Sequence, residues 1–226
     1  FRALSELKLI EELDLSDTQL RDVGFLKNTA LRNLNIANTK VYDFGILKNM
    51  PLVVLNLAGT QFKEMEYLRD KPLRYLEITG TGISDLSVLK GMELRELKAS
   101  QTNVKDLSPL AEMGLRVLEI AGTRVTDISA LENLPLERLV IADTAVSDIS
   151  VLRDKPLRHL DISRTKVKDI SVIRTLPLRA FYCNGAKITD YEVLRKMPIE
   201  ELGIDNPEKE QISRILWNMP RLRQVN

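Results

Sequence analysis

Few side chains in this sequence could perform catalysis. The chain has a single histidine, His159, and a single cysteine, Cys183. His159 and Asp161 stand two residues apart, so in a strand they share one face and the carboxylate could orient the imidazole as a base. The alternation of polar and apolar residues puts Cys183 on the opposite, buried face, and no nucleophile falls in register with His159. The sequence therefore predicts no catalytic residue.

Motifs for cofactors and metals are also missing from the sequence. It contains no phosphate-binding glycine loop, no dinucleotide-binding glycine turn and no HExxH zinc motif. A single cysteine excludes both an intrachain disulfide and a thiolate zinc cluster. We therefore expect neither a cofactor nor a bound metal.

The composition is that of a soluble folded protein. Hydrophobic residues make up 44% of the 226 residues and charged residues 29%, which excludes a disordered tract. The 33 basic and 32 acidic residues nearly cancel, so no net field recruits nucleic acid or a membrane surface. No apolar run approaches the ~18 residues that a membrane span requires. The sequence does not indicate a compartment.

A repeat of 21 residues organises the chain. Equivalent apolar residues recur at this spacing from Ile10 to Ile199, without insertion or deletion in nine consecutive units. The unit reads L-x-x-L-x-I-x-x-T-x-V-x-D-I-S-x-L-x-x-x-P, with apolar residues at positions 1, 4, 6, 11, 14 and 17. Positions 3 to 7 alternate polar and apolar, the pattern of a strand with one buried face. One unit cannot enclose a core, so stacked units must share one.

Two polar columns fit the joints between the elements of each unit. Position 9 is Thr in eight units, and we expect its buried hydroxyl to bond backbone groups of adjacent coils. Position 13 is acidic in all nine units and precedes an apolar residue and often Ser, which predicts the cap of a short helical turn. A column of carboxylates could instead bind calcium. The lack of a second acidic column beside it favours capping.

The unit resembles the leucine-rich repeat signature, with Thr where most members carry Asn or Cys. The continuation Asp127-Ile128-Ser129-Ala130-Leu131 is similar to short bacterial repeats such as those of internalins. The 21-residue form with Thr and a closing Pro-Leu also resembles repeats of large planctomycete-like bacterial proteins, some of which join them to serine/threonine kinase modules. The resemblance covers residues 10 to about 204. It implies an α/β fold, a right-handed curved solenoid with a parallel concave sheet and short helical turns or 3-10 segments on the convex side.

The N-terminal end departs from the repeat. Residues 1–9 contain Leu4-Ser5-x-Leu7, which predicts either a degenerate half-turn that caps the array or the cut edge of a longer array. The cut edge is favoured because no stronger capping pattern precedes Ile10. Residues 10–204 then hold the nine units and a final strand, and the chain is expected to be one domain of a larger protein.

The C-terminal end, residues 205–226, predicts a capping helix. Pro207 can occupy a first helical turn, and apolar residues then recur at helical spacing. We expect Trp217 and Leu222 to complete the seal over the last coil. The alternative is that Trp217 is an exposed binding contact. The residues with helical spacing are Ile212, Ile215, Leu216 and Met219.

Positions 3 and 5 vary between units, whereas the structural columns repeat. Their side chains project from strands about 4.8 Å apart and form one surface. Variation on a rigid scaffold suits a specific interface, and mixed aromatic, apolar and arginine side chains are typical of hot spots. Solvated surface with cross-strand charge pairs is the alternative. The outward positions are also expected to contribute little to stability. The candidate partner-binding residues are Tyr75, Glu96, Lys98, Val117, Glu119, Arg138, Val140, His159, Asp161 and Tyr182.

These observations favour a non-catalytic protein-recognition module of a bacterial protein, which binds a protein ligand through its concave face and is monomeric as a fragment of a larger protein. A first alternative is a sensor or targeting domain of a larger enzyme such as a kinase. A second is a surface structural or polyanion-binding protein, gripping its ligand with Lys166, Lys168 and Lys187 beside a column of arginines at position 2. Such basic side chains are otherwise solvated stems that cover apolar edges.

Overall fold

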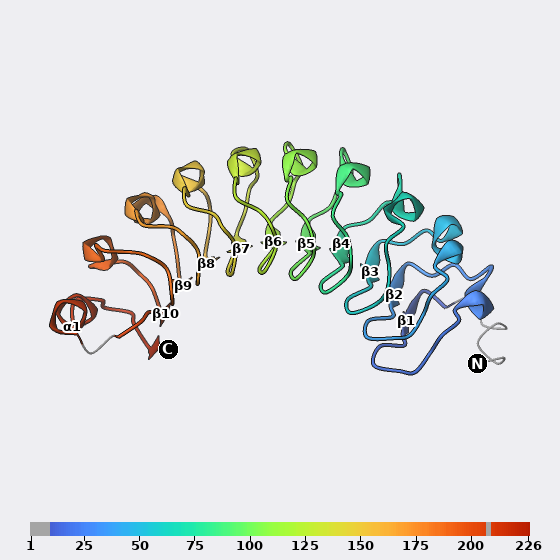
Figure 1. The fold of residues 1–226 in the computed structure, drawn as a ribbon, viewed down its shortest axis with the longest axis horizontal. Coiled ribbons are helices and arrows are strands. Elements are labelled where there is room, and N and C mark those ends of the chain that lie inside the picture. The colour runs from blue at the N-terminus through green and yellow to red at the C-terminus, as the bar shows by residue number, and fades with distance from the viewer. Residues whose placement is uncertain (1–9, 207–208) are drawn as a thin grey trace.

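A computed structural model of the protein describes residues 10–206 and 209–226. Within these residues the chain forms a curved solenoid, with the strands along the inner side of the arc and short helices along the outer side (Figure 1). The expectations for residues 1–9, as a half-turn or a cut edge, and for Pro207 lie outside the described residues.

Among the described residues, eleven parallel strands form one sheet in sequential order. Neighbouring strands pair in the register that the repeat predicts, so that Leu34 lies beside Leu55 and Leu118 beside Leu139. The parallel sheet of the concave face is thus confirmed. The strands are β1 (Glu12–Asp14), β2 (Asn33–Asn35), β3 (Val54–Asn56), β4 (Tyr75–Glu77), β5 (Glu96–Lys98), β6 (Val117–Glu119), β7 (Arg138–Val140), β8 (His159–Asp161), β9 (Ala180–Tyr182), β10 (Glu201–Gly203) and β11 (Gln224–Val225).

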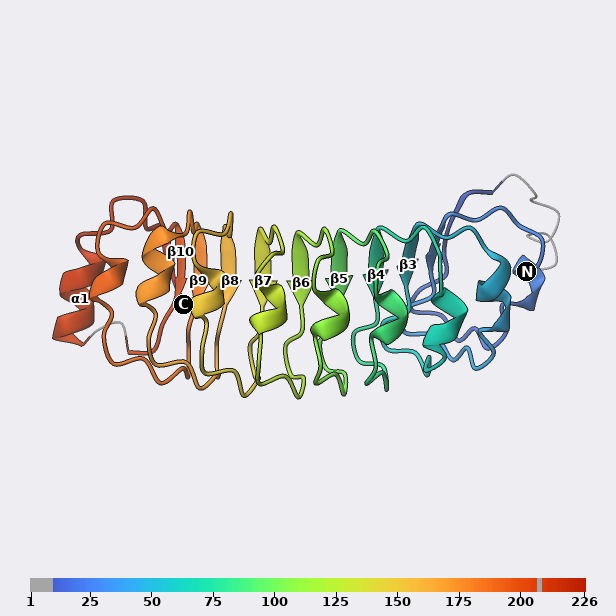
Figure 2. The same ribbon diagram turned by 90° about the horizontal axis from the view of Figure 1, so that it is seen from above.

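Short 3-10 helices form the convex side, and they stand in a row when the molecule is viewed from above (Figure 2). A 3-10 turn closes after three residues and suits a coil that must return within a short unit. The predicted helical turns are therefore confirmed. The helices are η2 (Gly24–Leu26), η3 (Gly45–Asn49), η4 (Met65–Leu68), η5 (Ser87–Leu89), η6 (Ser108–Leu110), η7 (Ser129–Leu131), η8 (Ser150–Leu152), η9 (Ser171–Thr175) and η10 (Glu192–Leu194).

The six apolar columns of the repeat form one continuous core between the sheet and the 3-10 helices. Leu118 and Ile120 of β6 and the coil beyond it, for example, have no exposed surface. A seventh buried column, at position 20, was not among those predicted. It is occupied by Met50, Met92, Met113, Leu134, Leu176 and Met197, with Thr29 in the first unit.

Two lysines take the place of the apolar residue in this seventh column. The Lys71 ammonium donates to the carbonyl oxygens of Lys48 and Met50 at 3.0 and 2.8 Å. Lys155 does the same to Glu132 and Leu134, at 2.6 and 3.0 Å. Burial lowers the pKa of both ammonium groups. Each lysine therefore bonds carbonyls of the preceding coil that an apolar residue would leave without this partner.

The threonines at position 9 act within their own coil, and the expected bonds to adjacent coils are wrong. Each hydroxyl donates to the carbonyl three residues earlier, as Thr39 does to Ile36 at 2.7 Å and Thr123 to Ile120 at 2.8 Å. The physical reason is the sheet itself. Just beyond each strand, backbone groups form hydrogen bonds directly with the next coil, as the Ile36 N–H does with the Asn56 carbonyl. The threonine hydroxyl therefore bonds within its own turn instead.

The aspartates at position 13 bond the start of the 3-10 helices, although they lie one residue before the N-cap position at which the pattern placed them. Asp106 accepts a hydrogen bond from the backbone N–H of Ser108 at 2.8 Å, and Asp148 accepts one from Ser150 at 2.8 Å. The backbone and hydroxyl of Ser108 lower the pKa of the Asp106 carboxyl. Glu64 breaks the pattern, because its longer side chain reaches back to the N–H of Lys63 instead.

The C-terminal end closes with both a helix and an extra strand. Helix α1 (Glu210–Leu216) is short, and its Ile212 and Ile215 are buried, as is Met219 just after it. The chain then returns to the sheet as β11, which pairs with β10 and was not foreseen. Leu222 packs half-buried against the core, as expected.

The burial predicted for Trp217 is wrong, because its side chain is 90% exposed. At about 100° per residue, Trp217 projects roughly 165° away from the mean direction of Ile212, Ile215 and Met219. Its place next to an apolar cluster in the sequence therefore does not place it against the core.

Cys183 provides a test of the register in the ninth unit. Its side chain has no exposed surface and burial raises the pKa of its thiol to about 12. Since the thiolate is the reactive form, we expect negligible labelling by a maleimide in the native state and complete labelling after denaturation. Rapid native labelling would mean that Cys183 does not face the core.

The orientation of α1 is tested by a pair of alanine variants. Trp217→Ala should change the free energy of unfolding by less than about 0.5 kcal/mol, as at ordinary surface sites. Ile215→Ala should cost about 2–5 kcal/mol, because it opens a cavity against the last coil. Denaturant titrations of both variants measure the difference, and a larger loss for Trp217→Ala would refute the orientation.

Candidate binding surface on the concave sheet

The concave face is built from the outer two residues of each three-residue strand. The central residue points into the core, and its two neighbours are half-buried on the open side in β2 to β8. Because the strands pair in register, each side chain lies beside its equivalents in the preceding and following units. All ten predicted partner-binding residues fall at the outer positions of strands β4 to β9.

A first aromatic centre lies on β4 and β5. The Tyr75 hydroxyl donates a short hydrogen bond to Glu77 of its own strand. From β5, the Lys98 ammonium lies 5.4 Å from the centre of the Tyr75 ring and 3.3 Å from Glu96 Oε1. Burial and the bond to Glu77 raise the pKa of the Tyr75 phenol. The aromatic ring, the cation and the two carboxylates of this centre thus interact with one another through a hydrogen bond, a cation–π contact and an ion pair.

A second aromatic centre lies on β8, β9 and β10. The rings of His159 and Tyr182 pack with their centres 5.3 Å apart. The Tyr182 hydroxyl donates to Glu201 Oε2 at 2.6 Å, and this bond is the first cause that raises the pKa of Tyr182 to about 12. Gly203 gives the ring its room, since a Cβ there would lie 2.7 Å from Tyr182 Cδ1.

Between the two centres, Arg138 of β7 donates to Glu119 of β6 at 2.6 Å. Val117 and Val140 flank this ion pair and remain half-exposed. Arg138 is also the strand partner of His159. Burial, followed by the positive charge of Arg138, lowers the pKa of His159, so the imidazole is held in its neutral form.

Asp161 does not act as an orienting partner for His159. Its carboxylate accepts the backbone N–H of Ser163 at 2.9 Å and so closes the turn after β8. Asn35 and Asn56 do the same at equivalent positions, with the N–H groups of Ala37 and Ala58. The negative charge of the Asp161 carboxylate still acts on Tyr182 and contributes to its raised pKa.

The expectation that the outward residues add little to stability is too simple. Tyr75, His159 and Tyr182 are half-buried and bonded or packed, so replacing them affects neighbours as well as solvent contacts. Three contributors were left off the predicted set, namely Glu77, Glu201 and Gly203. Glu77 could have been found two residues after Tyr75 on the same face. The diagonal bond from Tyr182 to Glu201 spans two strands and leaves no signal in the linear sequence.

Three of the six arginines at position 2 form ion pairs with glutamates. Arg116 lies 3.0 Å from Glu137 and Arg179 lies 3.1 Å from Glu200. Arg74 pairs with Glu93. Lys166 and Lys168 line a hollow of about 500 Å³ on one flank, but the capping aspartates of two units line it as well. These pairings reduce the positive field that a polyanion would find.

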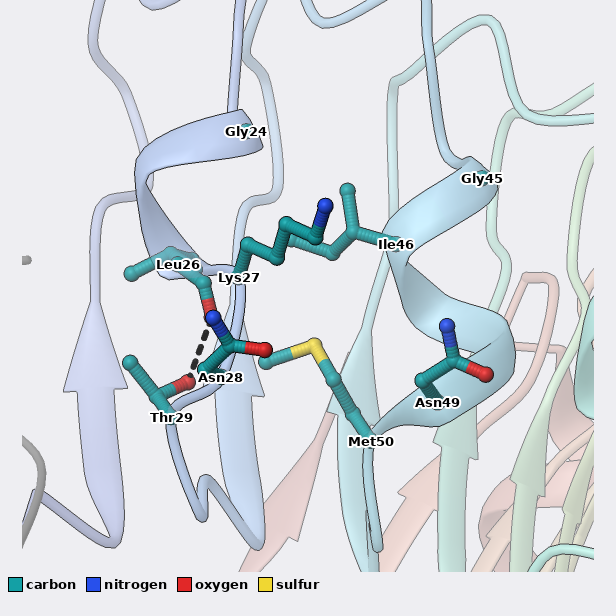
Figure 3. A pocket seen from close by; sticks show the side chains of 9 residues that line it. All are labelled: Gly24, Leu26, Lys27, Asn28, Thr29, Gly45, Ile46, Asn49 and Met50. Carbon is teal, nitrogen blue, oxygen red and sulfur yellow. Dashed lines mark hydrogen bonds between the residues drawn. The ribbon is translucent and has the colours of Figure 1, made fainter.

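A hollow of about 350 Å³ opens on the convex side between η2 and η3 (Figure 3). Gly24 and Gly45, which line it, stand where later units carry Ser or Glu. Lys27 and Ile46 reach toward one another across it, and Thr29 bonds the Leu26 carbonyl at 2.8 Å. The lining offers no paired acid and base, and no group of three metal-ligating side chains occurs among residues 10–206 and 209–226.

The repeat and the fold together define a leucine-rich repeat protein. Solved structures similar to it include the internalin InlF of Listeria monocytogenes, with 21% identity, a TM-score of 0.77, and coverage of 98% of this chain and 75% of that one. Internalin C2 of the same species has 26% identity and a TM-score of 0.68 over 77% of this chain and 81% of its own.

A plant receptor shares the fold as well. The ectodomain of the Arabidopsis thaliana receptor kinase GASSHO1/SCHENGEN3, solved in complex with CASPARIAN STRIP INTEGRITY FACTOR 2, has 15% identity and a TM-score of 0.64, covering 90% of this chain and 31% of that one. No protein-family model matches the sequence, and no curated protein sequence matches it. Within the part of the chain that the structure describes, no helix is long and apolar enough to cross a membrane.

The environment of His159 is tested by its titration. As the only histidine it gives one set of imidazole signals in an NMR spectrum. We expect a midpoint below the ordinary ~6.5, and Arg138→Gln should move it upward by removing a nearby positive charge. Arg124→Gln, on an exposed turn, should leave it unchanged.

The same shift fixes the sign of a stability effect. Because the folded pKa lies below the unfolded one, the unfolded chain binds more protons between the two values. The free energy of unfolding should therefore fall as the pH drops from about 6.5 through the folded pKa. A native midpoint at or above 6.5 would show that burial and Arg138 do not act on His159 as the structure indicates.

Proposed function

We propose that the chain is a non-catalytic protein-recognition module that binds a protein partner through its concave sheet. The observation that carries the proposal is that some positions of the repeat hold the same residue type in nearly every unit, whereas others vary. Core, threonine and aspartate columns repeat and support the scaffold, whereas the half-exposed concave columns differ from strand to strand. The concave sheet gathers tyrosine, histidine, valine and arginine, the residue types that anchor protein interfaces.

Catalysis has little support from the site. His159 is held neutral, but its neighbours are the Tyr182 ring and Arg138 rather than a nucleophile. Asp161 bonds the backbone of Ser163, and Cys183 faces the core on the opposite side of the sheet. The group that a nucleophilic mechanism requires beside its base is therefore not present in this arrangement.

Two alternative functions remain, a sensor or targeting domain and a polyanion-binding surface, and only the second would use a different surface. A sensor or targeting domain of a larger enzyme would use the same surface for binding, so it changes the context and not the role of the concave sheet. A polyanion-binding surface would use the basic flank instead, and the pairing of Arg74, Arg116 and Arg179 with glutamates disfavours it.

The test uses a partner isolated by cross-linking to the whole chain. Four single variants, Tyr75→Ala, Arg138→Ala, His159→Ala and Tyr182→Ala, are compared by calorimetric titration. At least one should weaken binding by about 2 kcal/mol or more, which is roughly 30-fold in Kd.

Lys90→Ala and Lys105→Ala, at exposed positions away from the concave sheet, provide the matched controls and should bind normally. Circular dichroism checks that each variant is folded. Full affinity in a folded variant carrying all four concave substitutions would move the interface elsewhere.

A further inference from the structure

The two aromatic centres of the concave sheet share a tyrosine whose hydroxyl donates to a glutamate, but Tyr75 stands at position 3 of its unit and Tyr182 at position 5. In each, a tyrosine hydroxyl donates to a glutamate, and the strand that follows the tyrosine carries a glutamate at position 3 of the unit. In the first centre that next strand is β5, with Glu96 at position 3 and Lys98 at position 5. In the second it is β10, with Glu201 at position 3 and Gly203 at position 5.

The first centre contains a lysine, whereas the strand after Tyr182 carries none at positions 3 and 5. The Lys98 ammonium lies over the Tyr75 ring and beside Glu96, so the chain itself supplies the cation there. Among the residues that the structure describes, no lysine or arginine lies over Tyr182. The nearby cation, Arg138, is already bonded to Glu119.

The charge of the whole concave sheet also favours a positively charged ligand. Positions 3 and 5 of β1 to β10 carry seven carboxylates and two cations, and both cations are paired within the sheet. The chain as a whole has a formal net charge of +1, so the negative charge is concentrated on this face. The carboxylates are Glu12, Asp14, Glu77, Glu96, Glu119, Asp161 and Glu201.

We propose that the second centre, formed by Tyr182, His159, Asp161 and Glu201, binds a lysine or arginine side chain that projects from a basic segment of the protein partner. This inference rests on the proposed function and names the chemistry of the partner. The cation would meet an aromatic ring and a carboxylate there, as the Lys98 ammonium meets the Tyr75 ring and Glu96. The curved, negatively charged sheet would attract the rest of the basic segment.

The protonation state of His159 agrees with this role. Its ring faces Tyr182 of β9, and the charges around it are Arg138, Glu119, Asp161 and Glu201. A neutral imidazole can pack beside a bound cation, whereas an imidazolium would repel it. Binding of the cation should accordingly weaken as the pH falls below the pKa of His159.

The probe for this site is a hexalysine peptide, with the fully ε-acetylated peptide as its uncharged control. The whole chain carries ¹³C-labelled tyrosine rings, and the ionic strength is held near ~0.05 M to limit screening. We expect hexalysine to shift the Tyr182 ring signals in a saturable manner, and the acetylated peptide to leave them in place. Tyr42, which is 71% exposed away from the concave sheet, should not respond.

Variants assign the binding to the centre. Tyr182→Leu and Glu201→Gln should each raise the hexalysine Kd by about five-fold or more, measured by fluorescence anisotropy of a labelled peptide. Glu112→Gln removes one exposed carboxylate on the convex side and should leave the Kd within two-fold of the wild type. Lys98→Ala should uncover the first centre, so that Tyr75 signals begin to respond to hexalysine.

Three results would overturn the inference. They are Tyr182 ring signals that do not shift on addition of hexalysine, equal shifts of the signals of all five tyrosines, and a hexalysine Kd that is unchanged in Tyr182→Leu. If the captured partner still depends on Tyr75 or Arg138 while Tyr182 ignores hexalysine, this inference fails and the proposed function stands. If hexalysine binds at Tyr182 but the partner tolerates all four concave substitutions, the proposed function fails instead.

Discussion

Stacking is the constraint on which the rest of the structure depends, because one 21-residue coil cannot bury its own apolar side chains. Each coil presents its leucines and isoleucines to the coils on either side, and the core runs without a break from the first unit to α1. Stability in such an array is a sum of terms between neighbours. The last coil has no following unit, and α1 with β11 covers the surface that would otherwise meet water.

The same constraint divides the surface into two kinds of position. Residues that join coils, such as the capping aspartates and the turn threonines, must recur in every unit. The outer residues of the strands face away from the core and are free to differ. Diversity collects on the concave sheet for this reason, and the scaffold holds it rigidly. Charge follows the same division, with carboxylates on the sheet and paired arginines along its edge.

The sequence predicts the role of a residue correctly where that role is the same in every repeat unit. The core columns, the strand register and the aspartate caps are of this kind. It fails where the role depends on a neighbour in space. Trp217 directly follows a helix whose orientation is set by its packing on the last coil. Lys71 can replace an apolar residue because carbonyls of the preceding coil accept hydrogen bonds from its ammonium group. The sequence placed Tyr182 on the concave sheet, but its partners His159 and Glu201 lie on two other strands.

Carboxyl footprinting of the complex tests the central claim, recognition through the concave sheet, most directly. The chain is treated with a carbodiimide and an amine, with and without its protein partner, and modified residues are located by mass spectrometry. The account predicts that the partner protects Glu96, Glu119 and Glu201, while the capping aspartates Asp106, Asp148 and Asp169 react equally in both samples. Protection of the aspartates with full reaction of the three glutamates would contradict it.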